Sequence, residues 1–333
     1  MSKKMMNSQL FQADAARVCQ SLAAKEKLDL VYLDPPYAVG AAMTARENKG
    51  EARGRKTAAS GRTAYVDAAG VEGLVAHLEP RLAAIRERMS DKASLFLHMD
   101  YRAVHDVKVA ADRVFGRRSY LGEIIWTPGN GSRGARGFSV THQNILLYAR
   151  HDKKRSVFRS DHPLLREPYA ATSLAMHFTH VDEDGRRYRE RKVGGKTYRY
   201  FADEGRRLGT VWTDIPAMVA NTPLRKEATG YPTQKPELLL ERIIRAASHE
   251  GDTVADLMCG SGTTLVVAQR LGRRFIGGDR SDVAIETTRK RLAQSKTSYD
   301  FKRLLDDDDA SCEASDNASL MPREDDRPVP ARS

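Results

Sequence analysis

The sequence predicts an α/β fold in which helices cover a largely parallel β-sheet. Leu28–Leu33 is a short apolar run, rich in β-forming residues, that stops at two prolines, as expected for a buried parallel strand. Residues 253–279 are typical of a strand, a glycine-rich turn, a helix and a second strand, which is the βαβ unit of parallel sheets. Helical patterns also separate the other apolar runs, so the chain alternates between the two element types.

The first predicted strand ends in the tetrapeptide Asp34-Pro35-Pro36-Tyr37. Proline cannot continue a strand ladder, so Asp34 lies at the carboxyl end of the strand, where open α/β sheets bind ligands. The prolines stiffen the turn beside the Pro35 carbonyl. The Asp34 carboxylate, the Pro35 carbonyl and the Tyr37 ring suit methylation of an exocyclic amine. The two oxygens can accept hydrogen bonds from the N–H groups of the amine and so free its lone pair, and Tyr37 can stack on a flipped-out base. The alternative is a proline-terminated strand with a surface Asp and Tyr.

The charge of the chain is strongly uneven. The chain has 333 residues, 41% of them hydrophobic, which suits one large α/β domain with an insertion or two domains. The formal net charge is +11, but residues 306–333 hold nine acidic residues and three arginines, so the preceding part carries 52 basic and 35 acidic residues, or +17. Such a basic body predicts a polyanionic partner, above all nucleic acid, although a generally basic protein is the alternative. The tail lacks periodic apolar residues and is expected to be disordered.

Several classes of protein are disfavoured by the sequence. No apolar run reaches 18 residues, so we expect no membrane span and no membrane partner. The N-terminus lacks the apolar core of a signal peptide, which favours a cytoplasmic location. The three cysteines, Cys19, Cys259 and Cys312, are an odd number without metal-ligand spacing, so we expect reduced thiols, no bound metal and no disulfide framework.

The N-terminal elements are a strand over residues 10–13 and a helix over residues 15–24. Asp14 falls between them, where its carboxylate could accept a hydrogen bond from the amino group of an adenine ring. A helix N-cap is an equally good explanation of Asp14. Residues 38–64 are rich in glycine, alanine and charge, and predict either a basic loop beside the tetrapeptide or a disordered insertion. The candidate nucleic-acid contacts in this segment are Arg53 and Arg55.

Between residues 71 and 149, apolar spacing predicts two helices and three strands. The helices are expected over residues 71–90 and 104–114, and the strands over residues 93–99, 121–126 and 144–149, the last two as a hairpin at the sheet edge. His98 could face the cleft or be an ordinary strand-end residue. The glycine-rich loop over residues 128–139 carries two further candidate nucleic-acid contacts, Arg133 and Arg136.

Residues 150–230 differ in character from the rest of the chain. Charge is dense, periodicity is weak, and aromatic residues interleave with arginines. This mixture suits phosphate contacts and base stacking, so an insertion here would choose the substrate. The alternative is the solvated charged face of a small subdomain. The candidate nucleic-acid contacts are Arg187, Arg189, Arg191 and Lys196.

The second informative block covers residues 231–294. We expect helices over residues 237–247, 265–271 and 282–294 and strands over residues 253–256 and 274–279. Glycines in the turn after Asp256 let a ligand approach the backbone, and Asp279, at the end of the next strand, can accept both ribose hydroxyls. The turn has neither the dinucleotide-binding spacing of glycines nor the P-loop Gly-Lys-Ser/Thr. It therefore fits an adenosine ligand without a pyrophosphate.

Together these motifs resemble those of the amino-DNA methyltransferases. The tetrapeptide at residues 34–37 matches their catalytic motif, and residues 256–264 with Asp279 match their S-adenosylmethionine motif. Residues 233–236, Thr-Gln-Lys-Pro, match the segment that precedes the cofactor strand in permuted members. The order of catalytic motif, variable basic region and cofactor motif is similar to that of the β group, which includes many adenine-specific enzymes. The resemblance covers residues 10–292.

The resemblance implies a Rossmann-like, circularly permuted S-adenosylmethionine-dependent methyltransferase fold with an inserted target-recognition region. Residues 1–150 would form the catalytic half, residues 151–230 the insertion, residues 231–300 the cofactor half and residues 301–333 the acidic tail. The catalytic residues are then Asp34, Pro35, Pro36 and Tyr37. The cofactor-binding residues are Asp14, Lys235, Asp256, Met258, Gly260, Ser261, Gly262, Thr263 and Asp279. Where the family commonly has proline and an aromatic residue, this chain has Leu257 and Met258, so we expect binding to survive in weakened form, with Met258 as an apolar wall.

The function implied by the resemblance is S-adenosylmethionine-dependent methylation of adenine N6 at a short specific site in duplex DNA, as in a restriction-modification system or by an orphan methylase. An Asp at the first catalytic position is typical of adenine-N6 members, whereas cytosine-N4 members more often carry Ser. The alternatives are cytosine N4, an amine in structured RNA, or a DNA-binding protein whose cofactor site has lapsed at Leu257. Family members are often dimers, so the candidate partners are duplex DNA, a second copy of the chain and a cognate restriction endonuclease.

Overall fold

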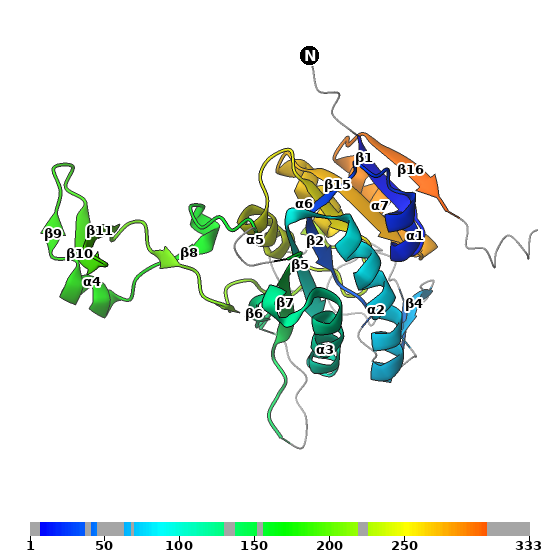
Figure 1. Ribbon diagram of the computed structural model, residues 1–333, viewed down its shortest axis with the longest axis horizontal. Helices are drawn as coiled ribbons and strands as arrows, with labels where there is room; N and C mark the ends of the chain where they lie inside the picture. Colours follow the sequence, from blue (N-terminus) through cyan, green and yellow to red (C-terminus); the bar gives the residue numbers. More distant parts are fainter. Residues whose placement is uncertain are drawn as a thin grey trace, which may run out of the picture.

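The computed structural model describes residues 7–36, 41–44, 63–67, 70–129, 137–151, 156–218 and 226–304. Within these residues, nine strands form the main sheet in the order β13-β6-β7-β5-β2-β14-β15-β1-β16 (Figure 1). Neighbouring strands run parallel from β5 to β16, as predicted, and the pairs β5–β7 and β6–β7 are antiparallel. The strands are β1 (Ser8–Gln12), β2 (Leu28–Leu33), β5 (Met89–Met99), β6 (Tyr120–Trp126), β7 (Gln143–Ala149), β13 (Val211–Trp212), β14 (Thr253–Asp256), β15 (Arg274–Asp279) and β16 (Tyr299–Arg303).

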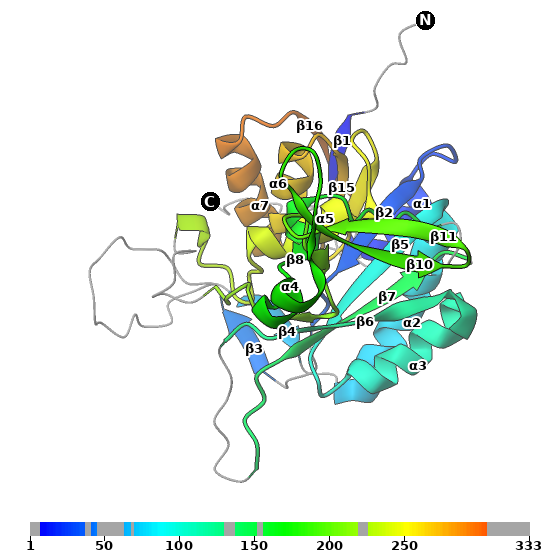
Figure 2. The same cartoon turned by 90° about the vertical axis from the view of Figure 1, so that its left-hand side faces the viewer.

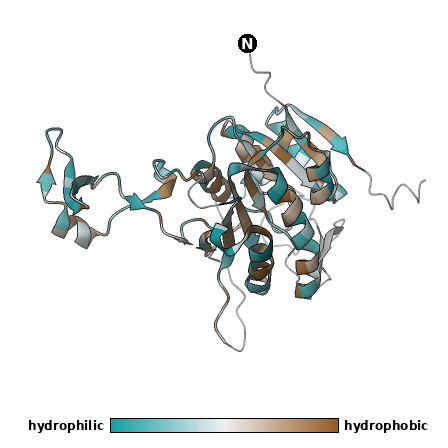
Figure 3. Ribbon diagram, viewed as in Figure 1, coloured by the Kyte–Doolittle hydropathy of each residue, from teal (hydrophilic) through white to brown (hydrophobic). Residues whose placement is uncertain are grey.

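Helices cover both faces of the sheet, which gives a three-layer Rossmann-like α/β fold. The helices α1 (Ala15–Ser21), α2 (Gly70–Arg88) and α3 (Val104–Phe115) pack on one face, and α5 (Glu237–Ala247), α6 (Thr263–Arg270) and α7 (Asp282–Gln294) pack on the other. Side chains of β2 alternate between the two cores: Val31 and Leu33 join the first, and Leu30 and Tyr32 join the second. Apolar residues accordingly concentrate in the body of the molecule (Figure 3).

The two informative blocks of the sequence meet at the centre of the sheet. Strand β2, which leads into the tetrapeptide, pairs in parallel with β14, with Val254 opposite Leu30 and Ala255 opposite Val31. Strand β14 also pairs in parallel with β15, and β15 with β1. Because parallel strands end at the same edge of a sheet, the polar residues that follow β1, β2, β14 and β15 lie together.

The predicted hairpin of β6 and β7 is confirmed, with Ile124 opposite Ile145, but it is not the outermost part of the sheet. The short strand β13 pairs with β6 beyond it, and Trp212 of β13 is buried. At the opposite edge, β16 pairs with β1 and extends past residue 300, where we expected the acidic tail to begin. The sequence of β16 is too polar for apolar spacing to reveal a strand.

A long arm projects from the body between β7 and β13 (Figure 1), and Figure 2 shows the arm end-on, in front of the body. We use "the arm" for residues 166–207. Its base is the pairing of β8 with β12, and its end is a three-stranded sheet of β9, β10 and β11 with α4 beside it. Its elements are β8 (Arg166–Glu167), α4 (Ala171–His177), β9 (His180–Val181), β10 (Arg187–Val193), β11 (Lys196–Phe201) and β12 (Arg206–Arg207), and the short helix Pro163–Leu165 precedes them. The projecting part is therefore narrower than the predicted insertion of residues 151–230.

The segment after the tetrapeptide contributes two strands where the sequence predicted a loop or a disordered insertion. Strands β3 (Ala41–Thr44) and β4 (Thr63–Asp67) pair with each other in antiparallel fashion. Within the described parts of the chain, no helix is long and apolar enough to cross a membrane. Six predictions lie outside the described residues: those for Tyr37, Arg53, Arg55, Arg133, Arg136 and the tail beyond residue 304.

Candidate active site

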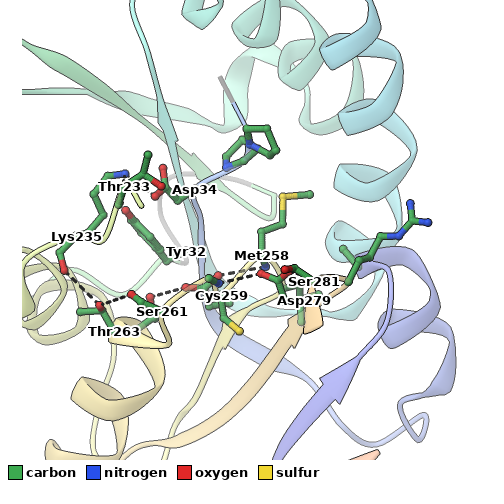
Figure 4. A pocket seen from close by; sticks show the side chains of 18 of the residues that line it. Tyr32, Asp34, Thr233, Lys235, Met258, Cys259, Ser261, Thr263, Asp279 and Ser281 are labelled. Atoms are coloured by element: carbon green, nitrogen blue, oxygen red, sulfur yellow. Dashed lines mark hydrogen bonds and ion pairs between the residues drawn. The ribbon is translucent and has the colours of Figure 1, made fainter. Parts of the chain in front are cut away.

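A cavity of about 400 Å³ lies at the carboxyl ends of β1, β2, β14 and β15 (Figure 4). Its volume falls in the range that small-molecule sites occupy. Of the predicted catalytic residues, Asp34, Pro35 and Pro36 line it, and so do all the predicted cofactor residues except Gly262. The structure thus brings the two predicted groups of residues to one site.

The glycine-rich turn after β14 is compact because two of its residues cannot carry a side chain. Gly260 and Gly262 have φ angles of 50° and 73°, in the left-handed region that favours glycine. A Cβ on Gly260 would lie 2.9 Å from the ring of Tyr231, and a Cβ on Gly262 would lie 2.6 Å from the Thr288 hydroxyl of α7. Gly262 therefore supports the site by letting α6 begin against α7, although it does not line the cavity.

Asp279 is fixed at the end of β15 by two backbone amides. Its Oδ2 accepts a hydrogen bond from Gly260 N at 2.9 Å, and its Oδ1 accepts one from Ser281 N at 2.9 Å. These bonds join the carboxylate to the glycine-rich turn. Burial raises the pKa of Asp279 above its usual range, and backbone hydrogen bonds from Ser281, Gly260 and Arg280 partly offset this rise.

Asp256, at the end of β14, is 3% exposed. Its carboxylate accepts hydrogen bonds from Met258 N at 3.3 Å and from the Thr264 hydroxyl at 2.5 Å. Burial raises the pKa of Asp256 to about 7, and the charges of Asp34 and Asp279 add to this effect. The cavity therefore has a surplus of carboxylates, which a bound cation would offset.

Lys235 lies at the tetrapeptide. Its Nζ is 2.5 Å from Asp34 Oδ2, and the two side chains are 7% and 16% exposed. Nζ also donates to Thr233 O at 3.3 Å, and the Lys235 carbonyl accepts a hydrogen bond from the Thr263 hydroxyl at 3.2 Å. We predicted Lys235 among the cofactor residues; the structure places its ammonium on the candidate catalytic carboxylate instead, while the residue still lines the shared cavity. A largely buried ion pair of this kind fixes the direction of the carboxylate.

Asp14 serves as the N-cap of α1, which confirms one of the two alternatives for this residue. Its Oδ1 accepts a hydrogen bond from Ala16 N at 2.9 Å, and its Oδ2 forms an ion pair with Arg81 at 2.5 Å. Asp14 also lines the cavity, so capping does not remove it from the site. Arg81 belongs to α2, and its partnership with Asp14 had no signal in the sequence.

Several lining residues were not predicted. His77 comes from α2, Tyr32 from β2, and Arg280 and Ser281 directly follow Asp279. The position of Tyr32 two residues before Asp34 on a strand was the one available signal, because such residues share a face. Leu257 is 1% exposed and joins the apolar core, and both Leu257 and Met258 line the cavity, where Met258 provides an apolar wall.

The basic residues of the arm fall into two groups. The first is held by the arm itself: the Arg187 guanidinium donates to the carbonyls of Leu174 and Phe178 at 2.8 to 3.1 Å, at the end of α4. The Arg189 guanidinium lies 5.2 to 5.5 Å from the ring centroids of Tyr169, Phe178 and Tyr200. Such contacts stabilise the arm.

The second group is exposed at the end of the β10–β11 hairpin. Arg191 pairs with Tyr198 and Val193 pairs with Lys196, so all four side chains lie on one face. Tyr198 and Val193 are 45% and 50% exposed, and Arg191 and Lys196 are also exposed. This end of the hairpin therefore presents cations beside an accessible aromatic ring.

Comparison with known proteins identifies relatives that match most of the chain. The sequence profile of the N6/N4 methyltransferase family, described as DNA methylase, matches residues 28–290. The Type II methyltransferase M.EcaI of Enterobacter cloacae is 25% identical over 326 residues, which cover 86% of this chain and 69% of that protein.

Solved structures share the fold at low sequence identity. The M1.HpyAVI–SAM complex superposes with a TM-score of 0.51 at 18% identity, covering 85% of this chain and 98% of that one. The cytosine-N4-specific PvuII DNA methyltransferase superposes with a TM-score of 0.52 at 12% identity, covering 86% of this chain and 87% of that one.

The raised pKa of Asp256 predicts that S-adenosylmethionine binds more tightly as the pH rises. Below pH 7 the carboxyl is mostly protonated and neutral, and above pH 7 it is an anion that attracts a sulfonium cation. We expect the Kd to fall between pH 6 and pH 8 by up to about tenfold. Calorimetric titration at several pH values measures this change, with Asp256→Asn as the control whose Kd should vary less. An equal Kd for the unmodified protein across this range would contradict the prediction.

Proposed function

The chain belongs to the DNA methylase family, whose members depend on S-adenosylmethionine, and we propose that it methylates N6 of adenine at a short specific site in duplex DNA. The observation that carries the proposal is the position of Asp34 and Pro35 across one cavity from the glycine-rich turn of Gly260. We further propose that the chain is a permuted member of the β group, because the strand of the tetrapeptide precedes the strand of the turn in the sequence.

The residues around the cavity fit S-adenosylmethionine. Asp279, fixed by two amides, would hold the ribose hydroxyls, and Asp14 would accept from the adenine amino group of the cofactor. The glycine-rich turn permits close approach to the backbone, and Met258 provides an apolar wall. Bound there, the cofactor supplies a methyl group on a sulfonium sulfur. The surplus of carboxylates in the cavity favours such a cation.

In the proposed mechanism, the Asp34 carboxylate and the Pro35 carbonyl accept hydrogen bonds from the two N–H groups of the target amine. This draws the nitrogen toward tetrahedral geometry and frees its lone pair from the ring. The freed lone pair would then attack the methyl group that the bound cofactor supplies, and Asp34 would take the departing proton and pass it to water. The target base must leave the duplex to reach Asp34, and Tyr37 would stack on it.

The choice of adenine rests on the aspartate at position 34. An Asp at this place is typical of adenine-N6 members, so methylation of cytosine N4 is the second candidate function. A DNA-binding protein without catalysis receives less support, because Leu257 is buried in the core and the cavity beside it keeps the size of a ligand site.

We propose that the arm contacts DNA through the exposed end of its hairpin. A two-stranded ribbon fits the major groove, and the Arg191 and Lys196 side chains carry the positive charge that phosphates attract. Arg187 and Arg189, which we also predicted as DNA contacts, would act by shaping the arm, since their guanidinium groups already contact α4 and aromatic rings.

Replacing the catalytic carboxylate tests the mechanism. Asp34→Asn removes the negative charge of the side chain that accepts a hydrogen bond from the target amine. We therefore expect kcat to fall by about a hundredfold or more while cofactor binding persists. Methyl transfer from labelled S-adenosylmethionine to DNA measures the rate. Asp91→Asn, on an exposed residue at the start of β5, is the matched control and should retain activity. Full activity of Asp34→Asn would refute the mechanism.

The identity of the methylated base is a separate prediction. After reaction of the purified protein with unmodified DNA, digestion to nucleosides followed by mass spectrometry should reveal N6-methyldeoxyadenosine. The carboxylate at position 34 is the reason for this expectation. N4-methyldeoxycytidine in its place would reject the choice of adenine while leaving the reaction class intact.

Charge changes on the arm should separate DNA contacts from structural residues. The double variant Arg191→Gln with Lys196→Gln should weaken DNA binding. It should also reduce the magnitude of the negative slope of log K against log salt concentration by about 2. The matched control is Glu190→Gln with Arg199→Gln, which removes a cross-strand ion pair and leaves the net charge of the arm unchanged. Equal losses of affinity in the two double variants would show that the hairpin end makes no special contact.

A further inference from the structure

A buried polar chain runs from β7 to the wall of the active-site cavity. The Tyr32 hydroxyl lies 2.7 Å from His98 Nδ1, and His98 Nε2 lies 2.6 Å from Gln143 Oε1. Tyr32 and His98 are 2% and 0% exposed, and the rings of His98 and Trp126 form a T-shaped pair with their centroids 5.7 Å apart. Neither the tetrapeptide nor the glycine-rich turn contains these residues, and the mechanism above does not use them.

The direction of each hydrogen bond in this chain follows from elementary chemistry. The Gln143 carbonyl oxygen can only accept, so His98 Nε2 carries a hydrogen and donates it. Burial, together with the charge of Lys235, lowers the pKa of His98 to about 3, so the imidazole is neutral and carries a single hydrogen. His98 Nδ1 must therefore accept, and the Tyr32 hydroxyl donates to it. The lone pairs of the Tyr32 oxygen are then available to the cavity as acceptors.

The Tyr32 end of this polar chain faces the ion pair of Lys235 and Asp34. Tyr32 and Asp34 are two residues apart on one strand and its extension, so their side chains share a face. Figure 4 shows the Tyr32 side chain pointing toward Lys235 and Asp34. The electrostatics agree, because the charge of Asp34 adds to the burial that raises the pKa of Tyr32. An oxygen that can only accept is a favourable neighbour for an ammonium group.

We propose that His98 and Gln143 are positioning residues, which hold the Tyr32 hydroxyl as an acceptor toward Lys235 and thereby fix the direction in which Asp34 meets the target amine. The inference rests on the proposed function and deepens it. It also links the active site to the β6–β7 hairpin, since Gln143 is the first residue of β7.

Gln143→Glu tests the direction of the hydrogen bonds from Gln143 to Tyr32 without a large change in side-chain shape. A carboxylate facing Nε2 favours the imidazolium, whose Nδ1 hydrogen would then be donated to the Tyr32 oxygen. The hydroxyl hydrogen would turn toward the Lys235 ammonium and loosen the ion pair. We expect kcat of this variant to fall about tenfold at pH 6 and to recover as rising pH neutralises His98. A kcat equal to that of the unmodified enzyme across the range would overturn the proposal.

Two substitutions of His98 separate positioning from packing. In His98→Asn the amide oxygen can replace Nδ1 as the acceptor, whereas His98→Leu leaves Tyr32 without one. We expect the Asn variant to keep kcat within about threefold and the Leu variant to lose about tenfold or more, with an unchanged Kd for S-adenosylmethionine in both. Thermal unfolding confirms that each variant folds. Equal losses in the two folded variants would mean that the imidazole only fills space.

Nitrogen-15 NMR of the histidine side chains in the cofactor-free protein determines the direction of these hydrogen bonds independently of catalysis. The proposal requires His98 to remain the neutral Nε2–H tautomer from pH 5.5 to pH 8. An Nδ1–H tautomer, or titration in this range, would overturn it. If the unmodified protein methylates no DNA, the proposed function fails, but these spectra still confirm or reject the hydrogen-bond direction.

Discussion

The parallel ladder between β2 and β14 is the constraint on which the site depends. It joins segments more than 200 residues apart, with Leu30 opposite Val254, and it sets the ends of both strands at one edge of the sheet. Asp34 and the glycine-rich turn therefore line the same cavity. Apolar residues on both faces of β2 pack under two helical layers, so a shift in register would bury charge and expose the core.

The charges of the cavity are arranged so that each carboxylate has a different environment. Asp14 is paired with Arg81 and caps a helix, and Asp34 is paired with Lys235. Among the residues that the structure describes, Asp256 has hydrogen-bond donors but no ion-pair partner, and its pKa is raised to about 7. Such a cavity favours a positively charged ligand near its unbalanced carboxylate. The lysine holds Asp34, the candidate catalytic carboxylate, in one direction. The electrostatics thus connect the fold to a sulfonium-dependent reaction.

The sequence predicted the elements that bury apolar side chains and missed those that do not. Apolar spacing located β14 and β15 to the residue, because a buried parallel strand must be apolar and must end at glycine or a polar residue. The arm strand Arg187–Val193 has no apolar period, since both of its faces are largely exposed, and it was seen only as a charged region. The contacts of Lys235 with Asp34 and of Tyr32 with His98 join different strands and loops, so tertiary packing alone creates them.

The central claim is that Asp34 and the glycine-rich turn form one methyl-transfer site for a base in DNA. Single-molecule sequencing of genomic DNA from a methylation-free bacterial host that expresses the chain tests this claim most directly. The account predicts N6-methyladenine at one short recurring motif, and its absence when the host expresses a chain altered at Asp34. A genome without new modified bases, from a host in which the folded protein binds S-adenosylmethionine, would contradict the account.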